Sequence, residues 1–194
     1  MKNTKQLILT EAVKLFAKEG YEAVTVEMIA AAVGIKAPSL YKHYKSKRDI
    51  FNSIIHEMER RDAESVADTP LPADTMEAVP EQYGDIPFDA FLDFCKKQFA
   101  YWTEDEFAAD FRRMLTVEQY RSKEMNVLYH QYLGSGPLGY TADILGSQTA
   151  ALELYAPMQL LYGVYDSADD KSAVKKMFET YIEEIRNKKE RQLK

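Results

Sequence analysis

Apolar residues recur every three to four positions along most of the chain, and the strict alternation typical of β-strands is hard to find. Ile8, Ala12 and Phe16 place one apolar stripe on a first helix, and Gly20 is suited to end it. The longest stretches with this period lie near the C-terminus, over about 147–165 and about 170–189. The pattern therefore predicts an all-α fold.

Two short helices are predicted after the first one. Thr25 is a good N-cap for the helix that follows it, and Glu27 lies in the first turn, where the helix dipole favours a negative charge. Gly34 ends this helix. A third helix is expected over about 37–43 with Pro38 in its first turn, where a missing amide costs nothing.

A longer fourth helix is expected next, opened by a capping box from Ser46 to Asp49. Residues 68–87 contain several prolines and acidic residues, which indicates a boundary or a long connection. Helical patterning resumes near Phe88, and "GSGPLG" is expected to break the chain at 134–139. We divide the chain into an N-terminal domain of short helices (1–46), a connecting helix (47–66) and a larger C-terminal domain (67–194).

Composition favours a protein of the cytoplasm. The 194 residues include a single cysteine, Cys95, so no disulfide can form within the chain. Charged residues interrupt the N-terminal apolar positions, unlike in a signal peptide, and no run approaches the roughly 18 apolar residues of a membrane span. We therefore expect a soluble cytoplasmic protein with no membrane partner.

The net charge of −6 conceals an asymmetry between the two parts of the chain. Residues 1–61 carry 11 Lys and Arg against 7 Asp and Glu, whereas residues 62–194 carry 14 against 24. The acidic net charge therefore describes the C-terminal part of the chain and not the N-terminal part.

The stretch "VEMIAAAVGIKAPSLYKHY" has the arrangement of a helix-turn-helix, in which one short helix braces a second against the DNA major groove. Leu40 and Tyr44 are four residues apart and are expected to face the core. This turns Pro38, Ser39, Lys42 and His43 outward, and surrounds them with cations that can bind phosphate: Lys36, Lys42, Lys45, Lys47 and Arg48.

The segment "ILTEAVKLFAKEGYEAVTVEMIAAAVGIKAPSLYKHYKSKRDIF" resembles the DNA-binding domain of the tetracycline-repressor (TetR) family. The resemblance covers about residues 3–55 and rests on the apolar first helix, the spaced "F…G…T…IA…G" and "LYKHYKSK". It implies an all-α homodimer that binds a palindromic operator on double-stranded DNA. It also implies a C-terminal domain that binds a small-molecule effector of unknown identity.

The resemblance also implies roles for individual residues. Thr25 would lie near phosphate, residues 36–43 would face the groove, and Tyr41 and Lys47 would reach phosphate. The expected DNA-binding residues are Thr25, Lys36, Ala37, Pro38, Ser39, Tyr41, Lys42, His43 and Lys47. The chain departs from the family pattern at two positions: Lys36 stands where a capping Ser or Thr is common, and Tyr44 stands where Phe is commoner.

The C-terminal part is rich in aromatic and methionine side chains, which normally form a core. Its tyrosines and methionines could also line an apolar ligand cavity with a few polar tips. Both readings stay open for the candidates, which are Phe91, Phe94, Cys95, Trp102, Phe111, Met114, Tyr129, Tyr155, Met158 and Tyr162.

The last two helices carry more Ala, Tyr and Met than one buried face needs, which predicts a two-fold dimer through a four-helix bundle. The small residues that would allow close approach are Ala150, Ala151, Ala156 and Gly163.

No nucleophile and base pair, phosphate loop or metal-ligand spacing appears, so we expect no enzyme, no catalytic residues, no metal and no cofactor. The favoured function is a ligand-responsive repressor. The alternative is a DNA-binding protein without a small-molecule effector, controlled by a protein partner.

Overall fold

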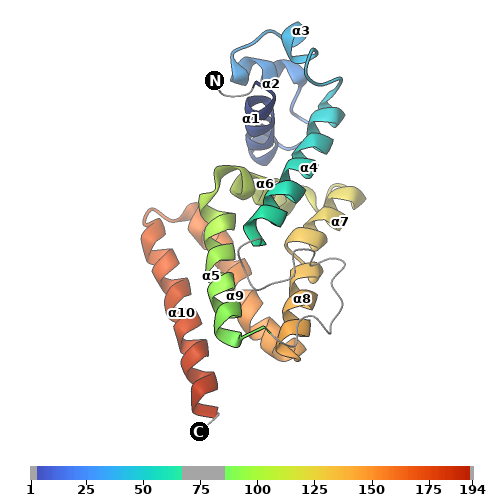
Figure 1. Ribbon diagram of the computed structural model, residues 1–194. Helices are drawn as coiled ribbons and strands as arrows, with labels where there is room; N and C mark the ends of the chain where they lie inside the picture. The colour runs from blue at the N-terminus through green and yellow to red at the C-terminus, as the bar shows by residue number, and fades with distance from the viewer. Residues whose placement is uncertain (1–3, 67–85, 193–194) are drawn as a thin grey trace. The chain divides into compact units, whose positions relative to one another are not determined.

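The computed structural model describes residues 4–66 and 86–192, and its regular elements there are all α-helices (Figure 1). This confirms the predicted all-α fold. Most of the predicted connection at 68–87, and the boundary at residue 67, lie outside the described residues, as do residues 1–3 and 193–194. None of the described helices is long and apolar enough to cross a membrane.

The chain forms two compact units. The first unit combines Met1–Glu64 with Glu106–His130, and the second combines Ser65–Asp105 with Gln131–Lys194. The first unit contains the predicted helix-turn-helix at the N-terminus, and the second contains the helix Phe88–Glu104 and the last three helices of the chain that the structure describes.

The first unit contains the four N-terminal helices and a fifth from the middle of the chain. Their bounds are α1 (Thr4–Glu19), α2 (Val26–Val33), α3 (Ala37–Leu40), α4 (Lys47–Val66) and α6 (Glu106–Glu118), followed by most of α7 (Lys123–Tyr132). α6 packs along α1, and α2 packs on α1 and α3. Apolar side chains from these helices form the core, including the fully buried Ile8, Phe16, Ile29, Leu40, Phe51 and Ile54.

The turn between α2 and α3 has the local chemistry that the sequence predicts. The Thr25 side chain accepts a hydrogen bond from the amide of Met28 at 3.3 Å and so caps α2. Gly34 has a left-handed φ of +77°, and the Ile35 amide returns to the Ala30 carbonyl at 2.9 Å. These bonds end α2 and redirect the chain into α3.

The third helix is shorter than predicted. It ends at Leu40 instead of continuing to His43. Beyond it, the amides of Lys42 and His43 bond to carbonyls three residues back, at 3.3 and 2.8 Å, which tightens the chain into turns.

The start of α4 carries the predicted cap. The Ser46 hydroxyl accepts a hydrogen bond from the Asp49 amide at 3.1 Å, and the Asp49 carboxylate accepts one from the Lys45 amide at 2.8 Å. The carboxylate reaches one residue further back than in the usual capping box, but it satisfies amides at the helix start in the same way.

The second unit is built from α5 (Phe88–Glu104), α8 (Ser135–Leu145), α9 (Gln148–Ser167) and α10 (Lys171–Gln192). α5 packs against both α9 and α10, and α8 packs against α9. Three helices meet at Phe99, whose ring centroid lies 4.4 Å from that of Phe178 and 5.5 Å from that of Tyr162. All three rings are buried, so this part of the interior is filled by aromatic contacts.

The prediction that residues 134–139 break the chain as a loop was wrong beyond Gly134. Gly134 is the N-cap of α8, and Pro137 lies in the first turn, where its missing amide has no helical partner to lose. Thr141 is buried and donates its hydroxyl to the Pro137 carbonyl at 2.8 Å. Residues that disfavour a helix interior are thus tolerated at a helix start.

Ion pairs join α10 to α5. Arg186 contacts Asp89 and Asp93 of α5 at 3.0 Å each, and Lys96 of α5 contacts Glu183 at 3.3 Å. These groups are partly exposed, so they orient the two helices more than they stabilise them.

In the first unit, α1 and α4 are joined through Glu57. Its carboxylate accepts hydrogen bonds from Arg60 and Arg61, each at 2.8 Å, and from the Gln6 amide group at 3.2 Å. The bonds from Arg60, followed by those from Arg61, lower the pKa of Glu57 to about 2.

We predict that Glu57 makes stability depend on pH. Because the folded-state pKa of Glu57 lies below its unfolded value, the stabilisation is complete above about pH 4.5 and is lost as pH falls towards 2. Replacing Glu57 with Gln should lower the free energy of unfolding by on the order of 1 kcal/mol at pH 7. In urea unfolding the difference should shrink between pH 4.5 and 3.

A matched control is Glu11→Gln, since Glu11 forms no ion pair within the described residues. A deficit of Glu57→Gln that stayed constant down to pH 3 would contradict the assignment.

Candidate nucleic-acid interface

Two buried side chains, one in α3 and one in the turn after it, anchor this segment to the core. Leu40 is fully buried, and Tyr44 is 7% exposed, as the four-residue spacing predicts. The Tyr44 hydroxyl donates a hydrogen bond to the Lys5 carbonyl at 3.3 Å, which satisfies the polar group that distinguishes this tyrosine from phenylalanine. Burial also raises the pKa of Tyr44, so this hydroxyl stays protonated and remains a donor.

The opposite surface of α3 and the following turn is open to solvent. Lys36, Pro38 and Lys42 are exposed, and Tyr41 is 50% exposed. The remaining predicted contacts on this segment are half-buried: Ala37, Ser39 and His43. Every predicted contact between residues 36 and 43 is therefore at least partly exposed.

Lys36 is the residue before α3, and its side chain forms no capping bond. The start of α3 thus has no side-chain acceptor from this position, as the departure from the family pattern suggested. The long side chain is exposed instead.

Thr25 is exposed at the start of α2, although its hydroxyl already accepts a bond from the Met28 amide. Its donor hydrogen is not needed for that cap, so the hydroxyl can cap the helix and donate to an outside acceptor at the same time.

Two of the predicted phosphate-binding cations have partners within the protein. The Lys47 ammonium donates to the carbonyls of Tyr21 at 2.8 Å and Glu22 at 3.3 Å. The Arg48 guanidinium forms two bonds to the carboxylate of Glu124, one of them at 2.7 Å. Lys36, Lys42 and Lys45 are exposed and form no ion pair with the residues that the structure describes.

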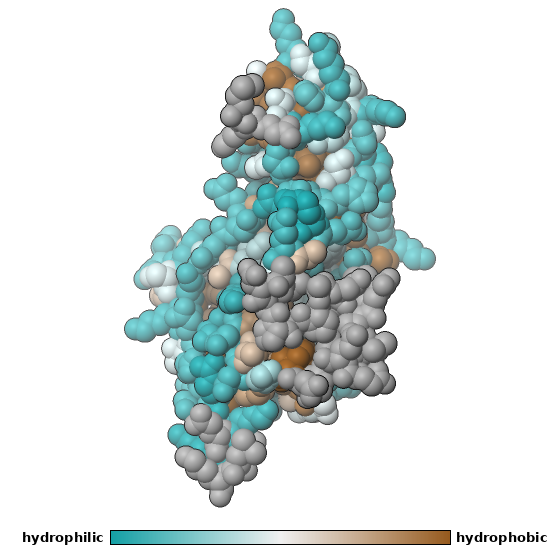
Figure 2. Space-filling view, in the orientation of Figure 1, coloured by the Kyte–Doolittle hydropathy of each residue, from teal (hydrophilic) through white to brown (hydrophobic). Residues whose placement is uncertain are grey.

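Figure 2 shows that hydrophilic side chains cover most of the visible surface around α1 to α4, with apolar groups showing only between them. Such a surface suits contact with a hydrated, charged partner better than with an apolar one.

Sequence reasoning missed two residues of α6 and α7 that bind the helix-turn-helix segment. Glu118 at the end of α6 accepts a hydrogen bond from the Tyr21 amide at 3.2 Å, and Glu124 holds Arg48. These pairs are 97 and 76 residues apart in the chain, so no local pattern could indicate them.

The ligand-pocket candidates are divided between the two units. Phe111, Met114 and Tyr129 belong to the first unit, and the others belong to the second: Phe91, Phe94, Cys95, Trp102, Tyr155, Met158 and Tyr162. Phe111 and Met114 are fully buried, whereas Phe94 and Tyr129 are half-buried.

Within the second unit, the candidates lie in different surroundings. The rings of Phe91 and Phe94 have centroids 6.3 Å apart, and the Trp102 ring centroid lies 5.3 Å from that of Tyr101 and 6.4 Å from that of Tyr132. Tyr155 donates its hydroxyl to the Leu133 carbonyl at 3.0 Å. Burial raises the pKa of Cys95 to about 12, so its thiol is protonated and unreactive.

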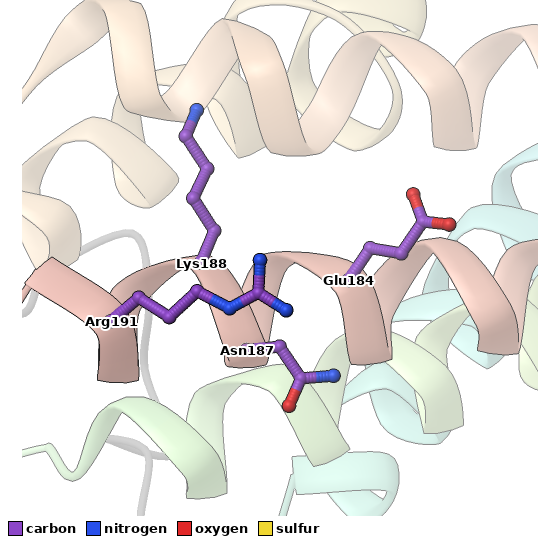
Figure 3. A pocket seen from close by; sticks show the side chains of 4 residues that line it. All are labelled: Glu184, Asn187, Lys188 and Arg191. Carbon is purple, nitrogen blue, oxygen red and sulfur yellow. The ribbon is translucent and has the colours of Figure 1, made fainter.

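Two open hollows lie along α10, and none of these candidates lines them. Glu184, Asn187, Lys188 and Arg191 line one of them, and Figure 3 shows all four side chains coming from this helix. The other is lined by residues from Ala173 to Glu184 of the same helix. Within the described residues, no three His, Cys, Asp or Glu side chains are grouped so that they could hold a metal ion.

Comparison with known proteins places the first helices in a family. Residues 8–54 match the family model of bacterial regulatory proteins of the tetR family. A segment of 51 residues, 26% of this chain, is 39% identical to the biofilm operon icaADBC HTH-type negative transcriptional regulator IcaR of Staphylococcus aureus. The match spans only 27% of the length of that relative.

Solved structures share the fold over most of the chain. SmeT, the repressor of the Stenotrophomonas maltophilia multidrug efflux pump SmeDEF, is 17% identical, with a TM-score of 0.58 over 93% of this chain and 87% of its own. Mycobacterium smegmatis AmtR is 12% identical, with a TM-score of 0.58 over 93% and 86%. The residues that fold into the helix-turn-helix of this chain thus match the tetR family of bacterial regulatory proteins.

Proposed function

We propose that this protein is a cytoplasmic transcriptional repressor that binds a palindromic operator as a homodimer and releases it when a small apolar or aromatic effector binds. The observation that carries DNA binding is the exposed surface of residues 36–43 above the buried Leu40. IcaR, whose matching segment covers the same helices, is named a negative transcriptional regulator, which supports repression.

DNA recognition would use both kinds of contact that the surface offers. Lys36 and Lys45 are long, exposed cations suited to phosphate, and Thr25 and Tyr41 present hydroxyls that can donate to phosphate oxygens. Lys42 lies on the groove-facing side, where a lysine can donate to the acceptor atoms of guanine.

We predict that Lys42→Ala relaxes base preference at one position of each half-site. An operator motif is first selected from a random duplex library with the wild-type protein. The variant should then bind that duplex about 5- to 100-fold more weakly by fluorescence anisotropy, because one base contact is lost.

The matched control is Lys97→Ala, which removes an exposed lysine of α5 in the second unit and should leave affinity unchanged. Equal affinity and an unchanged selected motif for Lys42→Ala would remove Lys42 from the base-reading residues.

A homodimer is supported by an apolar face on the second unit. Leu152, Leu160 and Val164 of α9 are 53%, 69% and 39% exposed, and their spacing puts them on one side of the helix. Ala156 and Gly163 lie on the same side, and a Cβ at Gly163 would meet open space. Ala151, in contrast, is fully buried inside the unit and is not available to a partner.

We predict that Leu160→Glu converts a dimer into a monomer, because it places a charge in the centre of the apolar face. In sedimentation at micromolar concentration the wild-type protein should have twice the chain mass of 22.3 kDa, and the variant should have the chain mass. Val127→Glu changes an apolar side chain of α7 that is 56% exposed and should remain dimeric. A wild-type protein that sedimented as a monomer would contradict the dimer.

An effector site among the α5 and α9 candidates is the favoured reading, since these helices pack together and carry Trp102, Tyr155 and Met158. The tight ring contacts around Phe99 support the alternative, in which no small molecule enters and a protein partner controls the regulator. The two functions differ in whether a compound binds the second unit.

We predict that an apolar or aromatic effector changes the emission of Trp102 saturably and weakens operator binding over the same concentrations. Trp102 is the chain's single tryptophan and is 5% exposed, so a ligand nearby alters its surroundings. Candidate compounds are found as those that raise the melting temperature, since ligands of the native state stabilise it.

Trp102→Phe is the control, because it should still bind the compound by calorimetry but show no such emission change. If no compound in a broad library raised the melting temperature, the effector-free alternative would be favoured.

A further inference from the structure

The end of α6 is hydrogen-bonded to the turn between α1 and α2. Glu118 is only 3% exposed, and its Oε1 accepts hydrogen bonds from the Tyr21 amide at 3.2 Å and from Arg121 at 2.9 Å. A buried carboxylate is costly unless it is paired, and here a guanidinium and a backbone amide both satisfy it.

The start of α7 is fastened to the start of α4. Arg48 donates through both terminal nitrogens to the two carboxylate oxygens of Glu124. These bonds lower the pKa of Glu124 and raise that of Arg48, so the pair stays charged at neutral pH. Residues 118–124, here called the α6–α7 hairpin, therefore hold two separate points of the helix-turn-helix.

Lys47 connects these two points. It precedes Arg48 in the chain, and its ammonium donates to the carbonyl of Tyr21, whose amide is held by Glu118. The ammonium also lies 4.5 Å from the centre of the Tyr21 ring. The turn before α2 and the start of α4 are thus tied to each other as well as to the hairpin.

Gly20 makes this close approach possible. Its φ of +85° is a conformation that side chains disfavour. A Cβ at this position would lie 2.9 Å from Glu118 Oε1 and 2.8 Å from an Arg121 nitrogen. The glycine is therefore required both by the backbone and by the carboxylate that packs on it.

The connectivity gives the hairpin a further property. Residues 106–130 of the first unit follow directly after α5 and end inside α7, and both flanking segments belong to the second unit. The segment that holds the helix-turn-helix is thus covalently joined to the second unit at both ends.

We propose that Glu118 and Glu124 are positioning residues for DNA binding, which hold the α1–α2 turn and the start of α4 so that the helix-turn-helix is presented in one arrangement. This inference rests on the proposed function. The turn that Glu118 holds leads into Thr25, and the helix start that Glu124 holds carries Lys47. If these points come loose, the fraction of molecules in the binding arrangement falls, and the apparent affinity falls with it.

The decisive variant is Glu124→Gln, because the positioning role and the change in net charge predict opposite effects on operator affinity. Removing a negative charge near DNA should strengthen binding, whereas losing the Arg48 pair should weaken binding to the selected operator about two- to fivefold. The matched control is Glu22→Gln in the turn itself, whose side chain forms no hydrogen bond or ion pair within the described residues. It should bind as tightly as the wild type or more tightly.

The proposal is overturned if Glu124→Gln binds as tightly as the control, or if the control weakens to the same extent. A double-mutant cycle tests the partner directly. In an Arg48→Gln background, Glu124→Gln should cause no further weakening, since the pair is already broken. Equal weakening in both backgrounds would contradict the pairing.

Hydrogen exchange tests the same residues without DNA. The Tyr21 amide should exchange at least about threefold faster in Glu118→Ala than in the wild type, because its acceptor is gone. An unchanged rate in a folded variant overturns the role of Glu118. If Glu118→Ala does not fold by circular dichroism, Glu118→Met takes its place, because methionine has a similar volume but no oxygen acceptor.

The two failures are distinguishable. A wild-type protein that selects no duplex motif contradicts the proposed function, whereas an operator-binding protein indifferent to Glu124→Gln contradicts only the positioning role.

Discussion

A helix of four residues has no stability of its own, and this constraint governs the candidate DNA-binding surface. Nucleating a helix is unfavourable in free energy, and the few internal hydrogen bonds of α3 cannot offset this. Its conformation is therefore imposed from outside, by Leu40 and Tyr44 in the core and by the left-handed turn at Gly34. Burying a leucine completely contributes about 1.5 to 3 kcal/mol, which is large for so small an element.

Because α3 depends on its surroundings, segments that are distant in the sequence contribute to holding it in place. The core beneath α3 is shared with α1, and α1 in turn packs against α6, which begins only at Glu106. The hairpin after α6 then holds the α1–α2 turn through Glu118. The helix-turn-helix is therefore not complete with its own four helices, since a later segment provides part of its packing and two of its polar contacts.

The sequence predicts best what is decided locally. Gly20 and Gly34 end helices, and Thr25 and Ser46 accept amide bonds at helix starts, because each of these effects involves residues within a few positions of each other. The same local reasoning failed at Gly134 and nearby, where glycine and proline indicated a loop but lie at a helix start. The pattern of buried Leu40 and exposed neighbours was also predictable, since it follows from helical spacing alone.

Contacts between distant segments could not be predicted from one sequence. From the sequence, Arg48 is a candidate for binding phosphate. Only the folded chain shows that its guanidinium is hydrogen-bonded to the carboxylate of Glu124. The same holds for Lys47, whose ammonium is bound to two carbonyls of the α1–α2 turn. A count of cations along the sequence therefore overestimates the number of cationic side chains that have no partner within the protein.

The distinction between paired and unpaired cations bears on how the surface would work. A cation already paired with a carboxylate must give up that pair, or share it, before it gains from a phosphate, so its net contribution to affinity is small. Lys36, Lys42 and Lys45 have no ion pair among the described residues, so they would lose no such pair on binding a phosphate. Lys47 and Arg48 are already bonded within the protein, so they would hold the surface in shape and leave DNA contact to the exposed lysines.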